Sequence, residues 1–340
     1  MEQQFDYYPD TDNRSNNANG GGGISDEILD YYFSTTQHQQ QQQQHQQQQA
    51  VGNSVCSGSG GIVPGLTLYQ HASGSPPAAT NTAMAGDFGN VHSFHKVEDV
   101  AKGLDKFLER ESAAAIERNG MFTVAFSGGS LPATACKYLR DNKAIDFSKW
   151  YVFLADERCV GYDSPESNYK LVKQELLDAL DGKIPESQVI AIDESLVGDP
   201  KAAAADYQEQ MESVFAKEHS KFPEFDCILL GIGPDGHTCS LFPGRKQIEE
   251  RSKWVVHIDD SPKEPPRRIT LTLPVLNAAR NVVFVVTGAG KSGTVKEIVD
   301  DRDAKKPASH VALSKGTLYW FLDVAAAKGL STTKPTEFKL

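Results

Sequence analysis

Asp235 and His237 are the two side chains of this sequence best suited by type and spacing to acid–base chemistry. They lie two positions apart in a glycine-rich segment, residues 231–237, directly after an apolar run. An imidazole has an unperturbed pKa near 6.5, so it can take a proton from water near neutral pH, and a neighbouring carboxylate can orient it or stabilise its charged form. The pattern indicates a general base. The alternative is a structural histidine, which is the commoner role of a lone histidine.

The glycines of the same segment also match G-x-G-x-x-G, the pattern of a dinucleotide-binding loop. Two features argue against that interpretation. Asp235 would lie where a pyrophosphate has to approach, and Pro243 followed by Gly244 would end the next helix after about two turns, whereas a dinucleotide-binding unit needs a long helix. We therefore interpret the segment as a loop that displays Asp235 and His237.

A second glycine-rich segment provides groups that can bind a phosphate. Gly128, Gly129 and Ser130 stand between an apolar run and the predicted start of a helix. Glycines let the backbone come close to an anion, and free amides at a helix N-terminus donate hydrogen bonds to it. The alternative is a tight turn that needs glycine only for its backbone conformation.

Three cationic side chains flank other apolar runs. Arg158 and Lys291 each follow such a run, and Arg268 precedes one. In an acidic protein these are the groups that would bind an acidic substrate, and the alternative is ordinary solvated charge. Lys291 ends the sequence GAGK, which resembles the end of a Walker A loop, but Val285 occupies the position of its first glycine. That departure argues against an ATPase.

The elements that must position these residues alternate along the chain. Apolar runs of strand length, separated by stretches of helical periodicity, predict an α/β fold with a Rossmann-like, mainly parallel sheet and helices on both faces. Ligands of such sheets bind at the carboxyl ends of the strands, where the candidate residues lie. Strands are predicted at residues 121–126, 151–155, 189–192, 227–232, 254–258, 269–273, 282–287 and 318–322, and helices at 131–140, 167–180, 200–217 and 292–300.

Composition divides the chain into three parts. Residues 1–92 are rich in Gln, Gly and Ser and offer little apolar surface, which predicts a disordered extension. Residues 93–330 carry the alternating patterns and are predicted to form the α/β domain. Residues 331–340 are predicted to be a C-terminal tail.

The 340-residue chain has a net charge of −11 and 39% hydrophobic residues. The negative charge argues against a nucleic-acid partner. No apolar run approaches the roughly 18 to 20 residues that span a bilayer, which argues against a membrane protein. The five cysteines include no C-x-x-C pair, and the N-terminal residues have neither a secretory nor a transit pattern, which favours the cytoplasm. The oligomeric state stays open between a monomer and a weak dimer.

Taken together and in order, residues 93–330 resemble the 6-phosphogluconolactonase family within the glucosamine-6-phosphate deaminase/6-phosphogluconolactonase superfamily. The resemblance rests on FSGGSL (126–131), DERCV (156–160), SNY (167–169), GIGPDGHTCSLFPG (231–244), SP (261–262) with RITLTLPVLNAAR (268–280), GAGK (288–291) and WFLD (320–323). The motifs at 231–244 and 268–280 are specific, whereas SGGS and DGH recur in related sugar-phosphate proteins. One departure is Arg245, where the family often has histidine.

The resemblance implies a small-molecule sugar phosphate as partner, no metal and no organic cofactor. The implied reaction is hydrolysis of 6-phospho-D-glucono-1,5-lactone to 6-phospho-D-gluconate in the oxidative branch of the pentose phosphate pathway. His237 would be the general base, with Asp235 beside it, and Arg158 would bind substrate and stabilise developing negative charge. The implied phosphate-binding residues are Gly128, Gly129, Ser130, Lys291 and Arg268.

Two other functions remain to be weighed. An aminosugar-phosphate deaminase/isomerase on the same fold would also carry SGGS and DGH, but it favours an aromatic residue where Arg158 stands and Asn-Glu-Pro where residues 240–243 read SLFP. A non-catalytic sugar-phosphate sensor of the transcription-regulator type would need a DNA-binding segment, and residues 1–90 are acidic.

Overall fold

The computed structural model describes residues 89–216 and 220–339. The predicted N-terminal extension lies outside these residues except for its last positions. There the first strand, β1 (Asn90–Phe94), begins at Asn90, ahead of the predicted domain start at Ser93. The domain therefore includes part of the segment that composition alone assigned to the extension.

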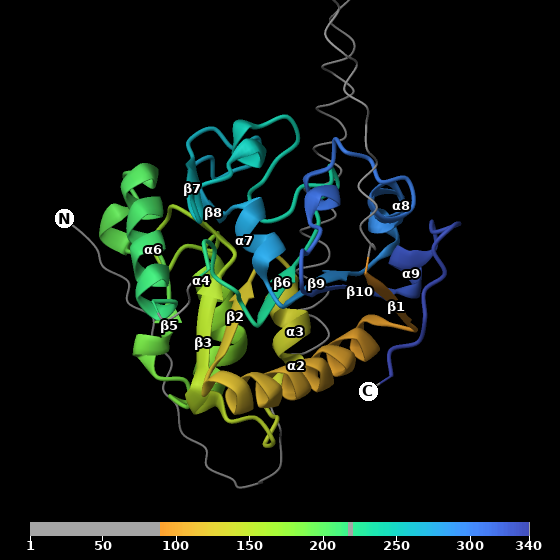
Figure 1. The fold of residues 1–340 in the computed structure, drawn as a ribbon, viewed down its shortest axis with the longest axis horizontal. Helices are drawn as coiled ribbons and strands as arrows, with labels where there is room; N and C mark the ends of the chain where they lie inside the picture. Colours follow the sequence, from red (N-terminus) through yellow and green to blue (C-terminus); the bar gives the residue numbers. More distant parts are fainter. Residues whose placement is uncertain (1–88, 217–219, 340) are drawn as a thin grey trace, which may run out of the picture. The chain divides into compact units, whose positions relative to one another are not determined.

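The central sheet contains seven strands, and every neighbouring pair runs parallel. Their order is β1-β10-β9-β6-β2-β3-β5, which Figure 1 shows from β1 at the right to β5 at the left. This confirms the predicted α/β fold with a mainly parallel sheet. The other six strands are β2 (Phe122–Phe126), β3 (Trp150–Leu154), β5 (Val189–Ile190), β6 (Cys227–Leu230), β9 (Asn281–Val286) and β10 (Thr317–Asp323).

Successive side chains of each strand enter two different cores, because side chains alternate between the faces of a sheet. In β2, Val124 and Phe126 join the core beneath the first group of helices, and Ala125 joins the core on the opposite face. Since both faces are covered, the strands read as continuous apolar runs. The first group of helices is α2 (Val97–Asn119), α3 (Leu131–Leu139), α4 (Asn168–Val172) and α5 (Asp178–Leu180), with a π-helical turn at Lys173–Leu177 between the last two. The opposite group is α6 (Pro200–Val214), α7 (Leu273–Ala278), α8 (Ser292–Val299) and α9 (Val324–Ala327).

A second, antiparallel sheet has the order β4-β8-β7. Its strands are β4 (Asp156–Arg158), β7 (Val255–Ile258) and β8 (Arg268–Leu271). The expectation that the runs at 254–258 and 269–273 belong to the parallel sheet is therefore wrong. The loop between them is too short for a crossover helix, so the two strands pair as a hairpin, and an apolar run alone does not show its partner.

The C-terminal residues lie along the outer edge of β1. The amide of Thr336 donates to the carbonyl of Val91 at 2.9 Å, and the amide of Ser93 donates to the carbonyl of Thr336 at 3.1 Å. The ring of Phe338 packs on Phe321 at 4.7 Å between centroids. The predicted tail is thus part of the domain, because it satisfies backbone groups of an edge strand that would otherwise be unpaired.

The order of the strands determines where the site lies. From β2 the chain continues to its neighbour β3 on one side of the sheet, and from β6 it continues to its neighbour β9 on the other side. The order of the strands therefore reverses between β2 and β6. At such a reversal the loops that leave the carboxyl ends of the strands diverge and open a crevice. The segments that carry the candidate residues follow β9, β6, β2 and β3, which are four adjacent strands.

Short 3-10 turns complete the domain, at Phe147–Lys149, Glu186–Gln188, Glu194–Leu196, Lys246–Glu249, Ala289–Lys291 and Pro307–His310. Among residues 89–216 and 220–339, no helix combines the length and apolar character that crossing a membrane requires. The four cysteines of this part of the chain are all free thiols, and all are buried.

Candidate active site

The loop that follows β6 is folded tightly around the imidazole of His237. The amide of Gly233 donates to the carbonyl of His237 at 2.8 Å, and the amide of Gly236 donates to the carbonyl of Gly233 at 3.0 Å. A Cβ atom at Gly233 would lie 2.0 Å from the imidazole ring, and Gly236 has φ +81°. Gly233 therefore makes room for the imidazole, and Gly236 provides the left-handed backbone conformation of the turn.

His237 is held in one orientation by two neighbours. Its Nδ1 is hydrogen-bonded to Oδ1 of Asp235, and its ring packs on Phe242 with centroids 4.6 Å apart. The side chain is 16% exposed, so it is reached by solvent although it is largely enclosed. Because a carboxylate can only accept, the proton of the neutral ring lies on Nδ1. The lone pair on Nε2 is then the one that can take a proton.

Burial together with the charge of Lys263 keeps the imidazole neutral, and His237 and Lys263 keep the carboxylate ionised. Burial lowers the pKa of His237 below its usual range, against the contact with Asp235, and the ammonium of Lys263 acts in the same direction as burial. For Asp235, burial alone would raise the pKa, but His237 and Lys263 outweigh it and hold the pKa below the usual range. A neutral imidazole beside an ionised carboxylate is the starting state of a general base.

Arg158 lies at the end of β4, the short strand that continues from β3. Its Nη1 donates to the carbonyl of Glu166 at 2.6 Å, and the side chain is 20% exposed. Its Nε is buried and has no hydrogen-bond partner among the described residues. Buried donors are rarely left without a partner, and such a donor can be satisfied by an oxygen of a bound ligand.

Arg268, at the start of β8, is buried, and its guanidinium donates to the protein itself. Nε donates to the carbonyl of Pro265 at 2.9 Å, and Nη2 donates to the carbonyls of Lys263 at 3.0 Å and Glu264 at 2.8 Å. Burial lowers its pKa to about 10, and the charge of Arg158 acts in the same direction. The structure thus places Arg268 beside Arg158, with most of its donors occupied.

Lys291 lies where β9 leads into α8. Its Nζ donates to the carbonyl of Ile232, in the loop that carries His237, at 3.0 Å. Burial lowers the pKa of Lys291 to about 8, and the charge of Lys263 adds to this effect. The preceding turn is held by Asp323, whose two carboxylate oxygens accept from the amide of Gly288 at 3.0 Å each. Lys291 is therefore directed toward the His237 loop.

The glycine loop after β2 begins beside the end of β6, since the amide of Ser127 donates to the carbonyl of Leu229 at 3.0 Å. A Cβ atom at Gly128 would lie 1.8 Å from Oδ1 of Asn168, and Gly129 has φ +71°. Gly129 and Ser130 are exposed at the N-terminus of α3. The close approach of Asn168 requires glycine at position 128, and the left-handed backbone conformation favours glycine at position 129. The amides of the turn stay accessible to an anion.

Known proteins are similar to this domain in sequence and in fold. Residues 95–320 match the family described as glucosamine-6-phosphate isomerases/6-phosphogluconolactonase. The chain is 43% identical over 247 residues to a Schizosaccharomyces pombe protein named probable 6-phosphogluconolactonase, covering 71% of this chain and 96% of that protein. It is 42% identical over 248 residues to the 6-phosphogluconolactonase of Rattus norvegicus, covering 72% and 94%.

The chain belongs to this glucosamine-6-phosphate isomerase/6-phosphogluconolactonase family. Solved structures agree: 6-phosphogluconolactonase from Trypanosoma cruzi superposes with a TM-score of 0.63 at 27% identity, covering 72% of this chain and 97% of that one. A structure named devB protein gives the same TM-score at 30% identity, covering 71% and 99%. The match to the family begins at residue 95, close to the start of the described domain.

Three further residues that contact the candidate site residues or their neighbours were not predicted from the sequence. Lys263 places its ammonium 3.9 Å from Oδ1 of Asp235. Glu157 and Asn168 are buried, and the amide of Asn168 donates to Glu157 Oε1 at 2.8 Å, which ties β4 to the start of α4. Glu157 and Asn168 stand in motifs of the family resemblance, whereas Lys263 lies between two of its segments, directly after Ser261-Pro262.

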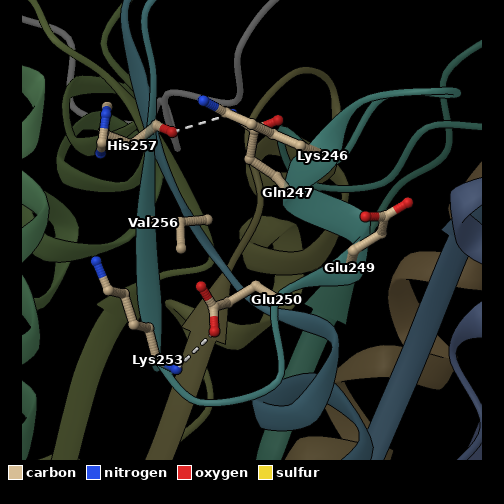
Figure 2. A pocket seen from close by; sticks show the side chains of 7 residues that line it. All are labelled: Lys246, Gln247, Glu249, Glu250, Lys253, Val256 and His257. Atoms are coloured by element: carbon tan, nitrogen blue, oxygen red, sulfur yellow. Dashed lines mark hydrogen bonds between the residues drawn. The ribbon is translucent and has the colours of Figure 1, made fainter.

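A pocket on the domain is lined by other residues. It is found beside β7 and the 3-10 turn Lys246–Glu249, and it includes none of the predicted site residues (Figure 2). The side chain of Gln247 donates to the carbonyl of His257 across it at 3.2 Å. Its lining mixes lysines with glutamates, so the charges of its side chains largely offset one another. The described residues also contain no cluster of His, Cys, Asp or Glu that could hold a metal ion.

Proposed function

We propose that this protein is a 6-phosphogluconolactonase that hydrolyses 6-phospho-D-glucono-1,5-lactone to 6-phospho-D-gluconate, in the oxidative branch of the pentose phosphate pathway. The observation that carries the proposal is the His237–Asp235 pair at the carboxyl end of β6, in a chain 42% identical to the rat 6-phosphogluconolactonase. A neutral imidazole poised beside a carboxylate is what hydrolysis of an ester by water requires.

In the proposed mechanism, Nε2 of His237 takes a proton from a water molecule while the water oxygen attacks the lactone carbonyl carbon. Asp235 stabilises the imidazolium that forms, because its carboxylate accepts the hydrogen bond from Nδ1. The tetrahedral intermediate then collapses, the bond from the carbonyl carbon to the ring oxygen breaks, and that oxygen receives the proton from Nε2. The carboxylic acid product ionises at neutral pH and releases one proton to solvent.

The cations supply the charge that this reaction needs. We assign Arg158 to the substrate and the developing oxyanion, because its buried Nε has no partner among the described residues. One well-placed donor of this kind contributes about 10²- to 10³-fold. The phosphate is assigned to the amides of Gly128, Gly129 and Ser130 and to Lys291, with Arg268 adding positive potential.

A pH-stat assay of the full chain tests the proposal. Proton release from the phosphorylated lactone above the spontaneous rate supports it. Binding of the lactone or of 6-phosphogluconate without turnover would instead support a sensor, and release of ammonia from glucosamine 6-phosphate would support a deaminase. The deaminase is not favoured, because the relatives at 41–43% identity are named as lactonases.

We also propose a cytoplasmic location, supported by four cysteines that are all free thiols in the described part of the chain. Cell fractionation with the full-length protein tests this, and recovery with an organelle would contradict it.

A further inference from the structure

The turn between β7 and β8 brings a lysine to the catalytic pair. The amide of Ser261 donates to the carbonyl of Pro266 at 3.0 Å, which closes the turn, and the amide of Lys263 donates to Oγ of Ser261 at 3.2 Å. The side chain of Lys263 is 25% exposed and places Nζ 3.9 Å from Oδ1 of Asp235. The same carboxylate oxygen is hydrogen-bonded to His237. One oxygen therefore faces an imidazole and an ammonium together.

The guanidinium of Arg268 holds this turn from inside the protein. Its three hydrogen bonds to the carbonyls of residues 263, 264 and 265 span the part of the turn that carries Lys263. Arg268 is only 3% exposed, and among the described residues it has no carboxylate at ion-pair distance. Burying a charge without an ionic partner is costly unless its donors are satisfied, and here backbone carbonyls satisfy them.

The guanidinium of Arg268 also contacts the body of the domain. Nη1 of Arg268 lies 3.4 Å from Oγ of Ser240, and that hydroxyl donates to Asp156 Oδ2 at 2.7 Å. The guanidinium also lies over the ring of Phe242 at 5.7 Å, and Phe242 packs on His237. Arg268 thus connects the body of the domain with the turn and with the ring behind the catalytic imidazole.

We propose that Arg268 is a positioning residue that acts through Lys263: it holds the 261–266 turn so that the Lys263 ammonium shares the Asp235 carboxylate with His237. Its effect on catalysis rests on the proposed function, whereas its effect on His237 can be measured without substrate. The assignment of Arg268 to positive potential near the phosphate is compatible with this role, but direct phosphate binding is not.

The shared carboxylate has a definite electrostatic consequence. Asp235 and Asp156 face His237 and favour its protonated form, and Lys263 opposes them. The charge of Arg268 lowers the pKa of Lys263, and the charge of Lys263 lowers the pKa of Lys291. A cation at 3.9 Å from the carboxylate therefore keeps the imidazole neutral at a lower pH than Asp235 alone would allow.

The first test is an NMR titration of the histidine side chains in the full-length protein without ligand, with the His237 signal identified by its loss in His237→Gln. Lys263→Met is expected to raise the pKa of His237, and Lys263→Arg is expected to preserve it. Arg268→Lys keeps the charge but cannot reach three carbonyls, so it is expected to raise the pKa as well. The matched controls are Lys253→Met and Arg251→Lys, since Arg251 also donates to backbone carbonyls at 2.6 and 2.7 Å.

The double variant Lys263→Met/Arg268→Lys separates action through Lys263 from an independent effect. If Arg268 acts through Lys263, the double variant titrates like Lys263→Met, because coupled residues are not additive. Additive shifts, or an unchanged His237 pKa in Lys263→Met, would overturn the proposal. Lys263→Met leaves the buried guanidinium untouched, so it remains decisive if Arg268→Lys does not fold.

Kinetics provide the second test. Arg268→Lys is expected to lower kcat about tenfold or more with little change in KM, because the loss is one of geometry around the base. A raised KM with unchanged kcat would identify Arg268 as a phosphate ligand and contradict the proposal. Absence of lactonase activity in the wild-type protein would instead reject the proposed function and leave the titration result standing.

Discussion

Arg158 and Arg268 are directly paired across the antiparallel strands β4 and β8. Two like charges at paired positions are unfavourable, and the carboxylate of Glu166, 3.4 Å from Nη1 of Arg158, offsets part of the repulsion. Neither arginine belongs to the parallel sheet. The pair nevertheless lies at the carboxyl edge of that sheet, because β4 follows β3 after one residue, Ala155. In the proposed function a negatively charged substrate would offset the remaining repulsion, with two of the cations supplied by the second sheet and the base supplied by the loop after β6.

The imidazole of His237 is expected to account for most of the catalysis. His237→Gln should lower kcat/KM by at least about a hundredfold, since a positioned general base contributes about 10²- to 10⁴-fold. Binding of 6-phosphogluconate, measured by calorimetry, should be largely retained because the cations are untouched. His257→Gln is the matched control, as His257 lies on β7 in the pocket apart from the site. Near-normal turnover in His237→Gln would reject the assignment of the base.

The positions of the strands could be predicted from the sequence, but not all of their pairings. All eight predicted apolar runs are strands, because burial on both faces makes a strand continuously apolar. β4 was missed because it reads Asp-Glu-Arg, and burial of its carboxylates depends on partners from other segments, such as the hydroxyl of Ser240 on Asp156. β1 was missed because most of its side chains are only half-buried.

The candidate site likewise contains residues that could be predicted from the sequence and residues that could not. His237 and the glycines around it could be found because their types and spacing carry the chemistry. Lys263 could not, because its place beside Asp235 depends on a turn that a residue farther along the chain, Arg268, holds through backbone carbonyls. Such a contact leaves no pattern in a single sequence.

The rate of hydrolysis is expected to fall on the acid side as His237 becomes protonated. Because burial lowers the pKa of His237, the acid limb of kcat/KM should lie below the usual histidine range near 6.5. Asp235 raises the pKa of His237, so Asp235→Asn should move this limb to still lower pH while lowering kcat at least about tenfold, since the imidazolium loses its partner. A pH-rate profile in the pH-stat measures both effects. A limb that moves to higher pH in Asp235→Asn would contradict the charge arrangement.

Gly128 is expected to be intolerant of even one methyl group. In Gly128→Ala the Cβ would meet Oδ1 of Asn168 at 1.8 Å, so either the glycine loop or the start of α4 has to move. Overpacking of this kind costs about 1–3 kcal/mol, which should appear as a lower Tm together with a raised KM. Gly293→Ala is the control, because Gly293 lies in α8 with open space around it, and alanine there should leave the Tm unchanged or raise it. Equal behaviour of the two variants would show that the Gly128 contact is not important.

The ends of the domain can be located by truncation. Deletion of residues 1–88 should leave kcat/KM and Tm unchanged within error, because β1 begins at Asn90 and the match to the family begins at residue 95. Deletion of residues 1–94 removes β1, which pairs along its whole length with β10, and should give an unstable or insoluble protein.

Deletion of residues 331–340 provides the corresponding test at the other end. It removes the hydrogen bonds of Thr336 to β1 and the packing of Phe338 on Phe321. Exposing one large aromatic contact of this kind costs about 2 kcal/mol, which in a domain of this size lowers Tm by roughly 4–8 °C. If apolar packing is the cause, Phe338→Leu in the full-length chain should lower Tm by less than the deletion does. An unchanged Tm after this deletion would show that residues 331–340 do not stabilise the domain. The edge of β1 would then be stable without them.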